Sequence, residues 1–185
     1  MSISYTAENL DKTRSTPMNM TNHSYFNLSG HKKWGNLDEH NVKVFAEHFT
    51  PVSDTLIPTG EIKKVENTGF DLRTGLNMTA EQLKKPDGAN GYDHNYAFGE
   101  IGMHDVLYCE HPNGRSMKVE SDAEGVQFYT GNFVPDCTGK GASYGKQTCF
   151  CVETQCYPNA VNEASFPTNV VKAGEVYRHN TNFMF

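Results

Sequence analysis

Glycine and proline divide the chain into short segments, and this punctuation limits its fold more than any other feature. Sixteen glycines and eight prolines are spread over 185 residues, and the segments between them are rich in Val, Phe, Tyr and Thr. Long runs with helical periodicity are absent from the sequence. Short β-favouring segments separated by turn residues predict an all-β fold, an antiparallel β-sandwich or barrel.

Seven segments carry the composition expected of strands. An Asn-Gly pair at Asn113 and Gly114 predicts a hairpin turn between two of them. Thr79–Leu83 is expected to form a short helical turn. The seven predicted strands are Asn41–Glu47, Asn95–Phe98, Asp105–Glu110, Ser116–Ser121, Gly125–Thr130, Thr148–Cys156 and Val176–Phe185.

Length and charge exclude several classes of protein. A chain of 185 residues is long enough for one domain with its own core, so a single domain over residues 1–185 is predicted. A net charge of −6 argues against nucleic acid and anionic membrane surfaces as partners. No apolar run is long enough to span a bilayer, and the N-terminus lacks a basic-then-apolar signal pattern. We therefore expect a soluble, cytoplasmic protein.

The five cysteines are expected to be reduced thiols. Their odd number fits poorly with a complete disulfide framework. A metal site built from Cys149, Cys151 and Cys156 is conceivable on paper, but the spacing lacks the second ligand pair of a zinc pattern. The sequence therefore predicts no metal.

Five blocks of the sequence stand out in order along the chain. They are NMTNHSYFNLSG (19–30), DTLIPTGEI (54–62), GYDHNY (91–96), GVQFYTGNF (125–133) and CVETQ (151–155), the last followed by PNAVN (158–162) and FP (166–167). These blocks resemble the motifs of the aldose 1-epimerases, which interconvert the α and β anomers of free sugars. The resemblance runs from about Ser4 to Phe185, and the family's fold implies that the chain is part of a galactose mutarotase-like β-supersandwich.

The resemblance implies roles for four residues. It assigns His23 as the general acid and Glu153 as the general base, with Asp93 and Gln127 binding the sugar. Anomer exchange needs one group to remove the proton of the C1 hydroxyl and another to protonate the ring oxygen. A carboxylate and an imidazole suit these tasks, because their free pKa values of about 4.3 and 6.5 can be tuned toward neutrality. Galactose and glucose are the implied substrates, and no cofactor is needed.

Each of these residues also has an ordinary structural explanation. A lone glutamate on a strand is usually exposed, and a lone histidine is often hydrogen-bonded within a loop. Strand alternation places Glu153 and Gln155 on one face with Cys149 and Cys151, and Gln127 on one face with Tyr129. Four aromatic side chains either wall the sugar or lie in the core: Tyr25, Phe26, Phe128 and Tyr129.

The remaining histidines show no metal-ligand spacing and are predicted to be surface or loop residues. His94 adjoins Asp93 and is the one that would border a cleft. The seven are His31, His40, His48, His94, His104, His111 and His179.

The family's domain is about twice as long as this chain, and its first half has no counterpart here. In the family that half supplies an arginine and a second histidine that bind the substrate. Strands without their partners would leave open sheet edges, so self-association is expected. A site with half its polar contacts would lose rate, so weak or absent activity of this chain alone is expected.

Three other functions remain open from the sequence. One is a carbohydrate-binding pseudoenzyme that keeps Asp93, Gln127 and Glu153 as a weak sugar site. Another is a fragment that assembles with a second polypeptide. The third is a sugar-phosphate epimerase, which requires cationic groups; the candidates, Arg73 and Arg115, lie outside the five blocks.

Overall fold

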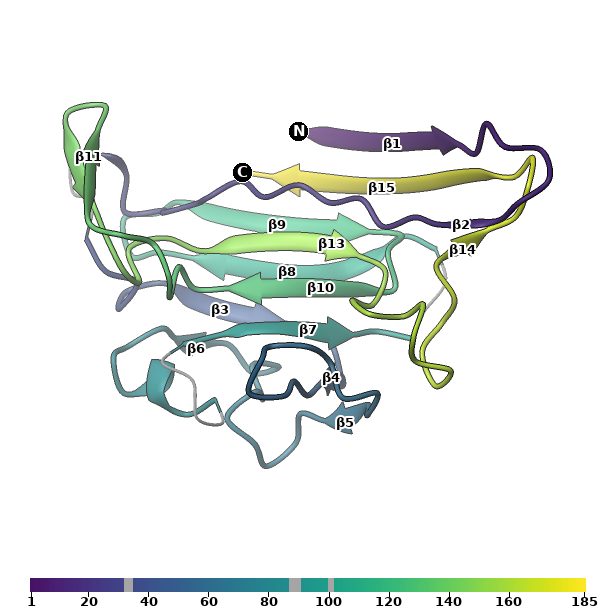
Figure 1. Ribbon diagram of the computed structural model, residues 1–185. Helices are drawn as coiled ribbons and strands as arrows, with labels where there is room; N and C mark the ends of the chain where they lie inside the picture. The colour runs from purple at the N-terminus through teal and green to yellow at the C-terminus, as the bar shows by residue number, and fades with distance from the viewer. Residues whose placement is uncertain (32–34, 87–90, 100–101) are drawn as a thin grey trace.

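The computed structural model describes residues 1–31, 35–86, 91–99 and 102–185, and its main feature is two antiparallel sheets that face each other (Figure 1). The predicted all-β antiparallel sandwich is thereby confirmed. In spatial order, the six-stranded sheet contains β1 (Ser2–Glu8), β15 (Val176–Met184), β9 (Ser116–Ser121), β8 (His104–Glu110), β3 (Asn41–Val44) and β6 (Leu76–Asn77). The five-stranded sheet contains β13 (Cys151–Gln155), β10 (Gly125–Tyr129), β7 (Asp93–Ala97), β4 (His48–Thr50) and β5 (Lys63–Lys64).

Two small two-stranded sheets lie outside the sandwich. One is the hairpin of β11 (Cys137–Gly139) and β12 (Ala142–Tyr144), which projects from one end of the sheets (Figure 1). The other pairs β14 (Val170–Val171) with β2 (Thr16–Pro17).

The core lies between the two large sheets, because strand alternation gives each sheet one apolar face. On the six-stranded sheet Leu107 pairs with Val119, which pairs with Phe183, and all three side chains are buried. On the five-stranded sheet Phe128 pairs with Val152, and both belong to the same core cluster. Burying a side chain of this size stabilises the fold by about 1.5–3 kcal/mol.

The longer predicted strands are confirmed, with ends that shift by a few residues. Ser116–Ser121 is observed with the predicted bounds. The predicted strand Thr148–Cys156 is shorter, Cys151–Gln155, because Phe150 forms an isolated bridge with Phe26 instead of continuing the ladder. Strands of two or three residues, such as β5, β6 and β11, were not predicted, since they are too short to show alternation.

The predicted helical turn at Thr79–Leu83 is observed slightly later, as the 3₁₀ helix η2 (Gln82–Lys84). Thr79 initiates it, because its side-chain oxygen accepts the backbone N–H of Gln82 at 3.1 Å. No helix in the described part of the chain is long and apolar enough to cross a membrane.

Three histidines predicted at the surface or in loops are instead buried: His40, His94 and His179 are 0%, 4% and 2% exposed. One ring nitrogen of His40 has a partner, since Nε2 accepts the backbone N–H of Leu28 at 2.8 Å, whereas the buried Nδ1 has none among the described residues. His94 does not border a cleft, because it follows Asp93 on β7 and alternation turns it toward the core. His179 lies within β15.

We expect Gly91→Ala to destabilise the fold by about 2–4 kcal/mol. Gly91 has φ +109° just before β7, and an added Cβ would collide with Oδ1 of Asn132. That amide also donates to the carbonyl of Tyr92 at 2.8 Å, so the collision would disturb the entry to β7. Denaturant unfolding measures the loss.

Gly114→Ala is the matched control for this variant. Gly114 also has a positive φ, +88°, but an added Cβ would meet nothing within 4 Å. This variant should therefore lose only the free energy of unfolding that corresponds to placing a non-glycine residue at positive φ, about 1 kcal/mol. Equal losses in the two variants would contradict the proposed collision.

Candidate functional site

The register of three strands gathers polar side chains on the face of the five-stranded sheet that points away from the core. Gln127 on β10 pairs with Glu153 on β13 and with Asn95 on β7. Two residues along, Tyr129 pairs with Cys151 on β13 and with Asp93 on β7. Paired residues project to the same face, so Glu153, Gln127 and Asp93 come together as neighbours.

The segment that carries His23 lies along β13, which ends the five-stranded sheet. The side chain of Asn19 donates to the carbonyl of Cys156 at 3.0 Å and accepts the N–H of the same residue at 2.9 Å. Further along, Phe26 and Phe150 exchange two backbone hydrogen bonds of 2.8 and 3.0 Å. His23 is held between these two attachments, over the face that carries Glu153.

His23 contacts both Glu153 and Cys151. Its Nε2 lies 3.4 Å from Oε1 of Glu153, and its Nδ1 lies 3.4 Å from Sγ of Cys151. The rings of Tyr25 and Tyr129 flank the imidazole, with centroids 5.1 and 6.2 Å away. The His23 side chain is 52% exposed and that of Glu153 is 11% exposed, so the histidine covers a buried carboxylate from the solvent side.

A chain of side-chain amides fixes the orientation of the neighbouring groups. Nε2 of Gln127 donates to Oδ1 of Asp93 at 2.8 Å. Nε2 of Gln155 lies 3.3 Å from Oε1 of Gln127 and 3.2 Å from Oδ1 of Asn95. Hydrogen bonds between buried and partly buried groups of this kind orient each side chain and restrict which atoms face a ligand.

Burial raises the pKa of the Glu153 carboxyl, and the negative charge of Asp93 raises it further, against the opposing effect of His23. Burial also raises the pKa of Asp93, which is opposed by the hydrogen bond from Gln127 and by His23. A carboxylate whose pKa is moved toward neutrality can both accept and return a proton. With His23 beside it, Glu153 forms a pair that is suited to proton transfer.

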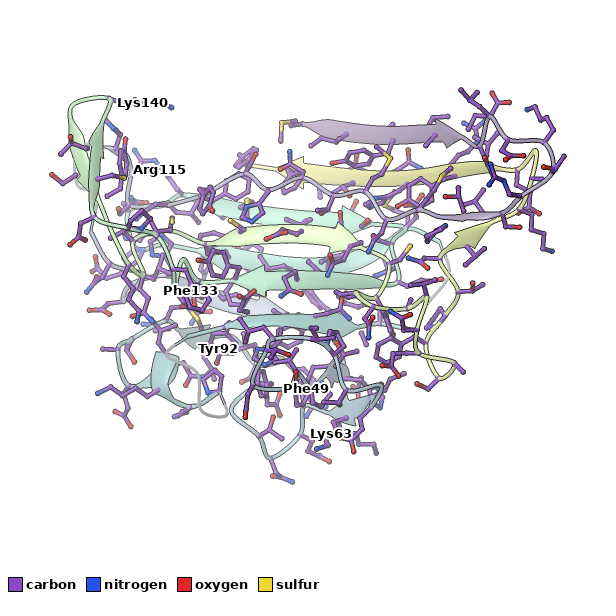
Figure 2. The ribbon with its side chains drawn as sticks, in the orientation of Figure 1. Phe49, Lys63, Tyr92, Arg115, Phe133 and Lys140 are labelled. Atoms are coloured by element: carbon purple, nitrogen blue, oxygen red, sulfur yellow. The ribbon has the colours of Figure 1, made fainter. Side chains whose placement is uncertain are left out.

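A pocket of about 640 Å³ adjoins this pair. Tyr25 and Tyr129, which flank His23, form part of its lining, together with Phe133 and the β11–β12 hairpin. Figure 2 shows Phe133 below this hairpin, whose tip carries Lys140. Tyr25 and Phe133 are 51% and 69% exposed, so aromatic surface is available to a ligand.

The other two aromatic candidates belong to the core or pack against it. Phe128 is fully buried in the core between the sheets, and Phe26 packs against Phe183 with ring centroids 5.7 Å apart. Of the four aromatic residues singled out by sequence, Tyr25 and Tyr129 therefore lie at the site. The other two help to hold the segment and the sheet that carry it.

One group of three potential metal ligands is found among the described residues: His23, Cys151 and Glu153, with all ligand atoms within 4.8 Å of one another. This group differs from the three cysteines considered from the sequence. All five cysteines are free thiols in the structure.

Three residues of the site were not assigned a function from the sequence. Asn95 and Cys151 both had a usable signal, since each lies two positions from a candidate residue on the same strand and so shares its face. Asn19 begins the first motif block, but its partner Cys156 is 137 positions away in the chain and could not be found from the sequence.

We expect the pKa of Glu153 to lie above about 4.3 and to fall in the Asp93→Asn variant. Removing the Asp93 charge favours the ionised form of its neighbour, so the titration midpoint moves to lower pH. NMR titration of ¹³C-labelled glutamate side chains measures this, with Glu153→Gln to assign the resonance. Asp54→Asn, in an exposed loop, is the control and should leave the midpoint in place. An unchanged or higher midpoint in Asp93→Asn would contradict the coupling.

Comparison with known proteins supplies the relatives of this chain. The family model for aldose 1-epimerase matches residues 1–184. Galactose mutarotase from Sus scrofa is 44% identical over 178 residues, which cover 94% of this chain and 51% of the relative. Aldose 1-epimerase from Escherichia coli is 30% identical over 193 residues, which cover 100% of this chain and 54% of the relative. The chain thus spans about half the length of the curated relatives it matches.

Solved structures agree with this relationship. An aldose epimerase homologue from C. elegans superposes with a TM-score of 0.84 at 26% identity, covering 99% of this chain and 55% of the other. A galactose 1-epimerase from Lactobacillus acidophilus, 22% identical, shares the fold with a TM-score of 0.76, covering 99% of this chain and 53% of the other. Because the family model covers nearly every residue, the chain belongs to the aldose 1-epimerase family.

Proposed function

We propose that this chain carries the proton-transfer groups of an aldose 1-epimerase acting on free hexoses such as galactose and glucose. The observation that supports this most directly is the 3.4 Å separation between Nε2 of His23 and Oε1 of Glu153. The two oxygens that exchange protons in anomerisation are both bonded to C1 of the sugar. An acid and a base that act on them must therefore be close neighbours.

In the proposed mechanism Glu153 removes the proton of the C1 hydroxyl while protonated His23 donates a proton to the ring oxygen. The bond between C1 and the ring oxygen breaks, and the C1 hydroxyl oxygen becomes an aldehyde oxygen. Rotation about the C1–C2 bond then presents the other face of the aldehyde. During ring closure Glu153 gives its proton to the aldehyde oxygen, and the hydroxyl formed from the ring oxygen gives its proton to His23. Both groups are thereby regenerated and no cofactor is consumed.

Asp93 and Gln127 are the proposed sugar-binding residues. They lie on the strands next to Glu153, and the hydrogen bond between them, 2.8 Å long, holds both near the candidate base. Carboxylate and amide groups pair well with sugar hydroxyls. The exposed rings of Tyr25 and Phe133 can cover the C–H face of a pyranose, as aromatic residues commonly do in ligand sites.

A free sugar fits the charged residues better than a sugar phosphate does. The guanidinium of Arg73 is bound by Asp71 at 2.8 and 2.9 Å and lies 3.4 Å from Glu47. That of Arg115 donates to the carbonyls of Leu28 and Ser29. A phosphate would require cationic groups directed at the ligand.

We also propose that residues 1–185 form one domain and that the protein is cytoplasmic. One core cluster contains side chains from both large sheets, which supports a single cooperative unit. All five cysteines are free thiols, and such thiols are typical of reducing compartments. A single denaturant unfolding transition tests the one-domain proposal, and cell fractionation tests the cytoplasmic location.

If the chain alone accelerates mutarotation, even weakly, we expect Glu153→Gln and His23→Gln each to lower that acceleration by about 10²–10⁴-fold or to the uncatalysed rate, the usual contribution of a general acid or base. The rate is measured by polarimetry of freshly dissolved α-D-galactose with the purified chain. Glu110→Gln, an exposed carboxylate on β8, is the control and should retain the wild-type rate.

A carbohydrate-binding protein without turnover is the competing function. Glu153→Ala distinguishes it from an enzyme: an enzyme loses turnover while sugar binding, measured by calorimetry, only weakens. A folded wild-type chain that binds galactose without accelerating mutarotation would support the binding protein. No turnover and no binding would contradict both functions for this chain and favour a fragment that needs a second polypeptide.

We further propose self-association through the edge of β1. This strand ends the six-stranded sheet. Met1 and Phe183 exchange two hydrogen bonds. In an antiparallel ladder every second residue forms such a pair, so Ile3 also bonds to β15, while the N–H of Ser4 points away from β15. An outward row of N–H and C=O groups can pair with a second strand.

Ser4→Pro should reduce this association without unfolding the chain. Proline removes the outward N–H and is tolerated on an edge strand whose N–H faces solvent. Sedimentation velocity should show a smaller average mass at the same concentration. An assembly of unchanged mass in Ser4→Pro would place the contact elsewhere.

A further inference from the structure

His23, Cys151 and Glu153 present three different kinds of metal ligand at one point. An imidazole nitrogen, a thiol sulfur and a carboxylate oxygen lie within 4.8 Å of one another. Each of these atoms is a normal ligand of Zn²⁺, and catalytic zinc sites commonly use three protein ligands with a fourth position open. Proton transfer between Glu153 and a sugar does not require the thiol, so the presence of Cys151 is not accounted for by the proposed mechanism.

The placement of the three side chains suits capture of an ion from solvent. Cys151 and Glu153 lie two positions apart on β13, so their side chains project from the same face. Both residues are buried. His23 is half-exposed above them. Its two ring nitrogens lie 3.4 Å from the sulfur and 3.4 Å from the carboxylate, so the imidazole is next to both of the other candidate ligands.

We propose that His23, Cys151 and Glu153 form a binding site for Zn²⁺ or a similar thiophilic divalent cation, and that this ion excludes the sugar. The exclusion follows from the proposed function, because the ion occupies the acid and the base together. Thiolate and imidazole ligands select zinc over magnesium and calcium, which prefer oxygen ligands. The ion is thus an inhibitor of the site and not a cofactor of the reaction.

Binding of the metal alone tests the site. The reduced chain is titrated with Co²⁺, a spectroscopic substitute for zinc, and then with Zn²⁺ against a chromophoric chelator. We expect one equivalent of Co²⁺ to bind and to produce a thiolate-to-cobalt charge-transfer absorption. Mg²⁺ should not displace it.

Variants identify the ligands. Cys151→Ser should abolish the charge-transfer absorption. Both Cys151→Ser and His23→Gln should weaken Zn²⁺ binding by more than about 10-fold, since loss of a residue that only hydrogen-bonds to a metal ligand already lowers metal affinity by at least that factor. Cys149→Ser is the matched control, because Cys149 precedes Cys151 by two positions and is also a buried free thiol. It should keep the absorption and the affinity. No absorption in the wild-type chain, or its retention in Cys151→Ser, would overturn the site.

Polarimetry separates this inference from the proposed function. Inhibition by Zn²⁺ that is relieved by a chelator and by higher galactose concentration is the expected result. A chain that binds one Co²⁺ through Cys151 but never accelerates mutarotation would support the metal site while contradicting the enzyme. An active chain that Zn²⁺ does not inhibit at saturating occupancy would overturn the exclusion of the sugar.

Discussion

The pairing of β10 with β13 on one side and β7 on the other is the constraint on which the rest of the structure depends. This register places Gln127 between Glu153 and Asn95, and Tyr129 between Cys151 and Asp93. The same register turns Phe128 and Val152 into the core. A slip of one residue would reverse both faces, so the apolar core and the polar site specify each other.

The segment around His23 depends on that sheet but is not part of it. β13 ends the five-stranded sheet, and the chain from Asn19 to Phe26 is attached to its two ends by hydrogen bonds. These attachments bring His23 to Glu153, 130 positions away in the chain. Small displacements of a catalytic group can lower rates strongly, so this attachment matters as much as the chemistry of the two side chains.

Burial gives the site its chemical character. A carboxylate in an exposed position would remain ionised at neutral pH and would be a weak base. Covered by His23 and placed near Asp93, Glu153 has a raised pKa, as does the Cys151 thiol beside it. The geometry that pairs Glu153 with His23 also brings the Cys151 sulfur within 4.8 Å of both, and this places three potential metal ligands together.

The sequence by itself determined the fold class, most of the longer strands and the family. Turn residues between short β-favouring segments indicated the antiparallel sandwich, and alternation along 149–155 correctly put Glu153, Gln155 and Cys151 on one face. It could not find strands of two or three residues, because they contain too few positions for a pattern. Nor could it show that His94 faces the core while its neighbour Asp93 faces the site, since the register of β7 was not known.

Only the tertiary structure decided which distant residues meet. Three sets of contacts join segments that are far apart in the sequence. They are the hydrogen bonds between Asn19 and Cys156, the contact of His23 with Cys151, and the side-chain hydrogen bonds that run from Asp93 to Gln155. Local sequence carries propensity and periodicity, which act over a few residues. Contacts between distant segments arise from the packing of whole sheets, so the geometry of the site follows from the fold and not from the motifs alone.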